Sequence, residues 1–126
     1  MNALWQKVNR EMVAKILAEL EYERTLRAEP VSADYWRITM GNACWQFRAT
    51  RGIWGWLHID PDTLTTTSGA AVEAENALLQ LATVLEMSDA QTAEHMEDLY
   101  ATLRGDMQLL QAREALDADA LIHLDP

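Results

Sequence analysis

The chain has 126 residues, of which 49% are hydrophobic and 24% are charged, enough apolar material for one globular domain with its own core. Its net charge of −10 argues against nucleic acid and against anionic membrane surfaces as partners, because like charges repel. It has no apolar run of the ~18 residues that a membrane span needs, so we expect no membrane anchor. Charged residues interrupt its N-terminal stretch, so we expect no secretory signal and predict a cytoplasmic location.

The first predicted element is a helix over residues 3–24, for which Asn2 is a suitable N-cap. Its apolar residues recur every three or four positions, which is the spacing of one helix face. These residues are Trp5, Val8, Met12, Ile16 and Leu20. Pro30 lies beyond the expected end of the helix.

Three strands of an antiparallel meander are predicted next, over residues 35–40, 44–51 and 53–59. The first two alternate apolar and polar side chains, and the Gly41-Asn42 dipeptide between them favours a tight turn. Gly52 permits the second reversal. The third segment is apolar on both sides, so we expect both of its faces to be at least partly covered.

The last third of the chain is predicted to be helical. A polar linker at residues 65–69 precedes a helix over 70–86. Ser88 and Gln91 have the spacing of a capping box and open a longer helix over 89–114, after which Asp117 is a candidate cap for a last short turn. Strands and helices are segregated along the chain, so the fold class is α+β, with two to three helices packed on the three-stranded sheet.

The sequence contains no recognisable catalytic constellation. His58, His95 and His123 are scattered, and Cys44, which is the only cysteine, has no base beside it in the sequence. The few glycines form no phosphate-binding pattern. We therefore assign no catalytic residue and no metal site to this chain, and expect a binding module or one part of a longer enzyme.

Arg48, Arg51 and Trp54 are the candidates for contact with a ligand. A guanidinium binds carboxylate and phosphate groups through paired hydrogen bonds, and the two arginines flank the turn before Trp54. The alternative for the arginines is ion pairing within this acidic chain. The tryptophans of the predicted sheet form either a stacking platform for a ligand or large rings that cover a small sheet.

Three stretches of the chain resemble the start of the NRPS-independent siderophore (NIS) synthetases, the IucA/IucC family that includes aerobactin synthetase. They read WQKVNREMVAKILAELEYE at 5–23, FRATRGIWGWLHIDPD at 47–62 and LEMSDAQTAEHMEDLYATLRGDMQLL at 85–110. The family opens with a similar helix that holds an Asn-Arg pair followed by a run of Ala, Leu and Glu. The order and spacing of the three stretches carry the resemblance.

The resemblance implies that residues 1–126 form the N-terminal, thumb-like domain of a longer synthetase whose ATP-binding core lies outside this chain. Such a parent uses ATP and Mg²⁺ to adenylate a carboxylic acid and condenses it with an amine or hydroxyl of a second siderophore precursor. This chain alone is then expected to bind neither cofactor and to be inactive. The remaining domains are its implied partners, and the family suggests a homodimer. Overall similarity leans toward hydroxamate members of the alcaligin type, with citrate-using members as the alternative.

Two other interpretations stay open from the residues. One is a free-standing acidic α+β binding or adaptor domain without catalysis, whose sheet face at Trp54 and Trp56 would be an exposed recognition patch. The other is a small enzyme in its own right, which would need a nucleophile or metal site that the sequence does not reveal.

Overall fold

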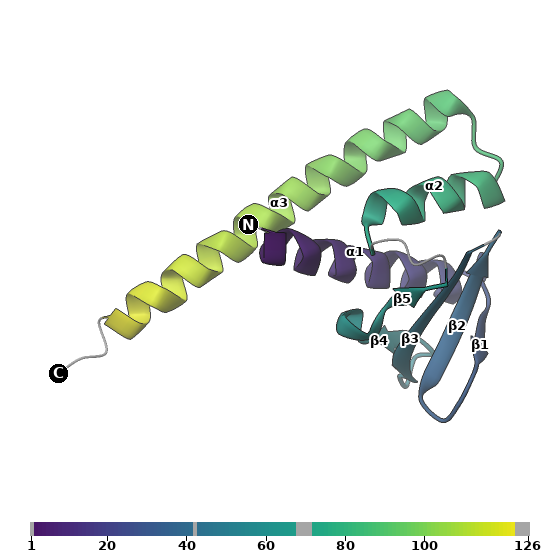
Figure 1. Cartoon of the computed structure of the whole chain (residues 1–126), viewed down its shortest axis with the longest axis horizontal. Helices are drawn as coiled ribbons and strands as arrows, with labels where there is room; N and C mark the ends of the chain where they lie inside the picture. The colour runs from purple at the N-terminus through teal and green to yellow at the C-terminus, as the bar shows by residue number, and fades with distance from the viewer. Residues whose placement is uncertain (1, 42, 68–71, 123–126) are drawn as a thin grey trace.

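The computed structural model describes residues 2–41, 43–67 and 72–122 and has the predicted α+β class. An N-terminal helix is followed by an antiparallel sheet and then by two helices (Figure 1). Among the described residues, none of the helices combines the length and the apolar character of a membrane span.

Helix α1 (Asn2–Tyr22) agrees closely with the first predicted helix. The side chain of Asn2, which was expected to cap it, lies outside the described part of the structure. Val13 and Leu17 are fully buried even though they lie off the predicted apolar stripe. The reason is that α1 is covered on two sides. It contacts β4 and the short 3₁₀ turn η1 (Pro61–Thr63) on one side and the later helices α2 and α3 on another.

The sheet has more strands than the sequence predicts. They are β1 (Ala28–Pro30), β2 (Tyr35–Met40), β3 (Ala43–Arg51), β4 (Leu57–Ile59) and β5 (Thr65–Thr66). The order is β1-β2-β3-β4, and β5 also pairs with β3. Strand β3 is therefore central: it pairs with β2 along one edge and with β4 and β5, one after the other, along the opposite edge.

The strand predicted over residues 53–59 is wrong for its first half. Only Leu57–Ile59 pairs with β3, whereas residues 52–56 form a turn closed by a 2.8 Å hydrogen bond from the Gly52 N–H to the Trp56 carbonyl. Gly55 adopts a φ of 88°, which favours glycine. As a result Ile53 and Trp54 project into solvent, and the expected cover on both faces is absent there.

Strands β1 and β5 were not predicted because each is too short to show an alternating pattern. Strand β1 ends at Pro30, which has no N–H to donate to a partner strand. Proline is tolerated there because β1 is an edge strand, paired only with β2 in the described sheet.

The core lies between the sheet and the helices. The register of β2 and β3 places Ile38 opposite Trp45, and both side chains are fully buried. The indole N–H of Trp45 donates to Gln80 Oε1 at 2.7 Å, which satisfies the polar atom of a buried ring and ties the sheet to α2.

Helix α2 (Ala74–Val84) is shorter than the predicted helix 70–86. Residues 68–71, which span the end of the predicted linker and the start of the predicted helix, lie outside the described residues. The capping box that opens α3 (Asp89–Ile122) is confirmed. The Gln91 N–H donates to Ser88 Oγ at 3.1 Å, and the Ser88 N–H donates to Gln91 Oε1 at 3.0 Å.

Helix α3 continues without interruption through Asp117, where a separate short turn was predicted. That prediction is wrong because neither glycine nor proline occurs between residues 106 and 122 to end the helix. Figure 1 shows the consequence: α3 packs beside α2 and then beside α1, and its C-terminal part extends away from the sheet.

Candidate functional site

Arg48 and Arg51 lie three residues apart on β3, so their side chains leave opposite faces of the strand. Arg48 is on the outer face, where its Nε lies 3.8 Å from Asp34 Oδ2 and both side chains are more than half exposed. An exposed pair at that distance contributes little to stability. The structure does not bring the two arginines together into one anion-binding site.

The guanidinium of Arg51 is engaged by the protein itself. Its Nη1 and Nη2 donate to Glu21 Oε1 and Oε2 at 3.1 and 3.3 Å, and Nη1 also donates to the Gly55 carbonyl at 2.7 Å. The same group lies 5.2 Å from the ring centre of Trp36. Both arginines thus make ion pairs within the chain, which was the alternative to ligand binding. Arg51 also fixes the 52–56 turn to the end of α1.

The sheet tryptophans do not form a common stacking platform. Trp45 is fully buried, and Trp36 is half-buried at the edge of the core. Trp56 is half-buried as well, because its ring stacks on Tyr22 with centroids 4.2 Å apart. Only Trp54 stands in solvent, so the recognition patch expected from Trp54 and Trp56 together is reduced to Trp54 and its neighbour Ile53.

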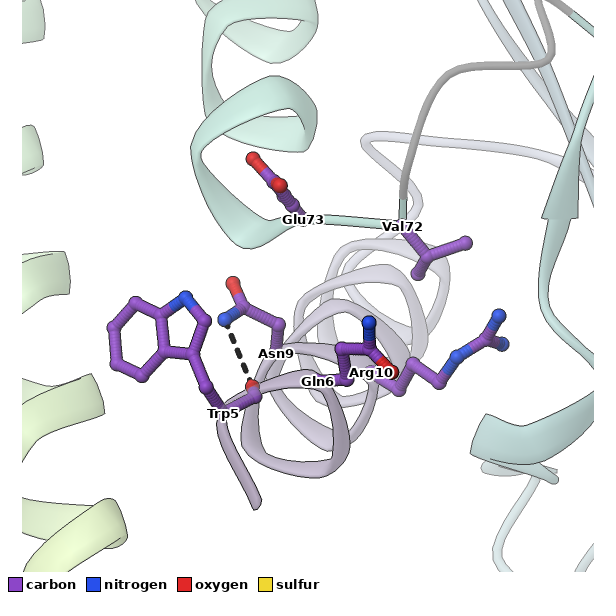
Figure 2. A pocket seen from close by; sticks show the side chains of 6 residues that line it. All are labelled: Trp5, Gln6, Asn9, Arg10, Val72 and Glu73. Atoms are coloured by element: carbon purple, nitrogen blue, oxygen red, sulfur yellow. Dashed lines mark hydrogen bonds between the residues drawn. The ribbon is translucent and has the colours of Figure 1, made fainter. Parts of the chain in front are cut away.

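A small recess that the sequence did not predict lies where α1 meets the start of α2 (Figure 2). Its volume is about 280 Å³, and it is lined by Trp5, Gln6, Asn9, Arg10, Val72 and Glu73. Asn9 is 3% exposed. Its Nδ2 donates to the Trp5 carbonyl at 3.0 Å, and its Oδ1 accepts the Ala74 N–H at 2.9 Å.

Asn9 therefore caps α2 from a different helix. Glu73, the residue at the N-cap position of α2, makes no side-chain capping bond, and Asn9 supplies an acceptor for the first N–H group instead. The sequence carried a signal for this role. Asn9 interrupts the apolar stripe of α1, one turn after Trp5, and a polar residue at a buried position needs a partner.

Arg10, the next residue, holds the segment around η1. Its Nη1 donates to the carbonyls of Pro61 and Leu64 at 3.1 and 3.0 Å. The Asn9-Arg10 pair thus fastens α1 both to α2 and to the chain between β4 and β5. The recess contains no nucleophile beside a base, so its chemistry is that of a structural junction.

Tyr100 and Glu75 join α3 to α2. The Tyr100 hydroxyl donates to Glu75 Oε2. This hydrogen bond, followed by desolvation and the negative charge of the carboxylate, raises the pKa of Tyr100 above its usual value of 10.0. Tyr100 also lines a hollow on α3, together with Met96 and Arg104.

Nothing among the described residues points to a metal or nucleotide site. Within residues 2–41, 43–67 and 72–122, no group of three His, Cys, Asp or Glu side chains is placed to hold a metal ion. The first turns of α2 and α3 carry acidic residues and are capped by protein side chains, which disfavours a phosphate there.

The remaining sequence candidates are dispersed. His58 lies on β4 and His95 on α3, and His123 lies outside the described residues. Cys44 is half-buried on β3, with its Sγ 4.0 Å from Thr39 Oγ1. None of these described side chains forms a nucleophile–base pair with another.

Comparison with known proteins yields no matching family model but several similar sequences. The chain is 54% identical over 121 residues to aerobactin synthase of Escherichia coli, a match covering 96% of this chain and 21% of that protein. It is 38% identical over 130 residues to aerobactin synthase of Vibrio mimicus, covering 98% and 22%. It is 30% identical over 66 residues to the rhizobactin siderophore biosynthesis protein RhbF of Rhizobium meliloti (strain 1021), covering 52% and 11%.

A solved structure agrees with these sequences. The chain matches aerobactin synthetase IucC from a hypervirulent pathotype of Klebsiella pneumoniae with a TM-score of 0.86 and 54% identity. The match covers 90% of this chain and 21% of that one. The chain thus spans about a fifth of the length of the two aerobactin synthases and of this structure.

Proposed function

This chain belongs to the NIS siderophore synthetases, whose N-terminal portion it matches, and from that premise we propose that it serves as the N-terminal, thumb-like domain of an ATP-dependent ligase. The parent enzyme would condense a carboxylic acid with an amine or hydroxyl of a second siderophore precursor. Residues that hold ATP and Mg²⁺ would lie in the rest of that polypeptide. The enzyme would act in the cytoplasm, as a homodimer.

One observation carries this proposal: the 54% identity to E. coli aerobactin synthase extends over 96% of the chain. A shared fold alone would not support a shared activity, because one fold hosts many functions. Identity at this level over nearly the whole chain supports a shared role as well. The named relatives are aerobactin and rhizobactin proteins, so the lean toward alcaligin-type members gains no support from them.

The interior of the chain supports a scaffolding role for this domain. Its buried polar contacts, such as those of Asn9 and Trp45, connect its own elements to one another. The proposed contribution to catalysis is to present a rigid surface to the remainder of the synthetase, and not to supply reacting groups.

The test is pyrophosphate release by the full-length synthetase with Mg-ATP and hydroxylamine, assayed across a panel of acids that includes citrate and succinyl-hydroxamate precursors. We expect release to depend on one class of acid, and the 126-residue chain alone to give none. Turnover by the 126-residue chain alone would overturn the proposal, as would a full-length enzyme that responds to no acid in the panel.

A further inference from the structure

The 52–56 turn carries the two most exposed large apolar side chains of the described chain. Ile53 is 96% exposed and Trp54 is 83% exposed. These two side chains are called the apolar tip below. Single exposed apolar residues are common, but two adjacent ones on a turn, one of them a tryptophan, mark a contact surface.

The turn that carries the apolar tip is held in place by contacts with α1 and by hydrogen bonds within the turn. Arg51 links it to α1 through both carboxylate oxygens of Glu21 and holds the Gly55 carbonyl at 2.7 Å. The ring of Trp56 stacks on Tyr22 with an interplanar angle of 7°. The backbone of the turn is closed by bonds from Gly52 to Trp56 and from Gly55 to Gly52.

This bracing matters for binding. An exposed side chain on a mobile loop loses conformational freedom when it docks, whereas one on a fixed turn loses much less. Beside the tip lies a recess of about 480 Å³ lined by Glu21, Tyr22, Arg24, Arg51, Trp54 and Gly55. A projecting tryptophan next to a hollow with charges of both signs has the form of an anchor point in a protein interface.

The size of the apolar tip decides which partner it fits. A buried tryptophan contributes about 150–250 Å². Even with Ile53, the tip falls well below the ~800 Å² per partner of a stable complex between separate molecules. The net charge of −10 further opposes a second copy of the chain at this surface.

A segment of the same polypeptide does not need so large a surface, because tethering gives it an effective concentration of about millimolar. The relatives are roughly five times longer than this chain, which matches about 21% of their length. We propose that the apolar tip docks into an apolar recess of the remaining synthetase polypeptide and fixes this domain against it. This inference rests on the proposed function.

The first experiment is hydroxyl-radical footprinting of the full-length synthetase, read by mass spectrometry. Trp45, which is fully buried, and Trp56, which is half-buried, are internal references. If the tip is docked, Trp54 oxidises at a rate close to that of Trp45 and at least tenfold more slowly than in the urea-unfolded protein. If Trp54 oxidises fastest of the three, the proposal is wrong.

The second experiment compares Trp54→Ala with Val31→Ala in the full-length protein by hydrogen exchange. Val31 is also an exposed apolar residue, but it lies outside the 52–56 turn, so it is a matched control. We expect Trp54→Ala to speed exchange of the amides of residues 52–56 at least tenfold and Val31→Ala to leave it unchanged. Equal exchange in both variants contradicts docking.

Further outcomes separate this inference from its rivals. Protection of Trp54 that disappears on dilution indicates a second copy, and protection that appears only with Mg-ATP and acid indicates closure over a ligand. Either result overturns the proposal. Acid-dependent pyrophosphate release is measured on the same preparations. An active enzyme with an accessible Trp54 refutes the docking alone, whereas an inactive enzyme with a protected Trp54 refutes the proposed function alone.

Discussion

Asn9 lies in the middle of the apolar stripe of α1, and its side chain connects two parts of the chain that are 65 residues apart. A buried amide group is destabilising unless both of its ends find partners. Here the Nδ2 group and the Oδ1 atom each make one hydrogen bond, to Trp5 and to Ala74. The position of α2 against α1 is therefore specified by a polar contact in addition to apolar packing.

We predict that Asn9→Ala lowers the free energy of unfolding of the chain by about 1–3 kcal/mol, because the Ala74 N–H loses its acceptor at a buried site. Urea titration measures the difference. Gln6→Ala is the control, since Gln6 lines the same recess but is exposed, and it should change stability by less than ~0.5 kcal/mol. Equal effects of the two substitutions would argue against the capping role.

At the scale of helices and strands, elements with a local pattern in the sequence were predicted, whereas elements that depend on pairing with distant parts of the chain were not. Helical spacing placed α1, alternation placed β2 and β3, and the spacing of Ser88 and Gln91 placed the start of α3. Each of these depends on neighbours within a few residues. Strands β1 and β5 exist only because β2 and β3 offer edges, and two or three residues carry no pattern of their own.

The turn at 52–56 was missed for a different reason. Its residues are apolar, which imitates a strand, so the sequence predicted a reversal at Gly52 alone and did not reveal the part that Gly55, with its φ of 88°, plays in the turn. The binding partner of Arg51 could not be predicted from the sequence either. The carboxylate that binds Arg51 is on Glu21, 30 residues earlier, and only the fold reveals that contact.

The contact between α2 and α3 has a pH dependence that follows from Tyr100. Its pKa is raised in the folded chain, so the folded state holds the hydroxyl proton more tightly than the unfolded state does. This contribution to stability is fully present below the unfolded pKa of 10.0 and is lost as the pH rises through the higher folded value.

We predict that Tyr100→Phe is destabilising at pH 8 by about 0.5–1.5 kcal/mol, the net contribution of a typical hydrogen bond, and less destabilising above pH 10. Unfolding by urea at both pH values gives the two differences. Tyr35→Phe is the control, because Tyr35 lies at the start of β2 and belongs to neither α2 nor α3. A Tyr100→Phe effect that is independent of pH would contradict the proposed role of its bond to Glu75.

On the scale of the whole molecule, the charge is unbalanced. The sequence has 20 acidic and 10 basic residues, so at least ten carboxylates have no cation to pair with individually. Some of the cations are already paired, as Arg37 is with Glu29 and Arg51 is with Glu21. The first half of α3 exposes Glu94, Glu97 and Asp98 close together on one helix. Repulsion among these groups opposes the compact state.

We predict that raising NaCl from about 10 mM to about 150 mM stabilises the chain by roughly 1 kcal/mol, because the screening length falls from about 30 Å to about 8 Å. Salt also weakens the attraction within the ion pairs, but the described ion pairs are few compared with the excess acidic residues, and exposed pairs contribute little to stability. Urea midpoints at the two salt concentrations measure the effect. The double variant Glu94→Gln, Glu97→Gln should respond less to salt, whereas Gln108→Ala, which changes no charge on the same helix, should respond like the original chain. A midpoint that falls with salt would mean that attraction within the ion pairs outweighs the repulsion, and the acidic surface would then not limit the stability of this domain.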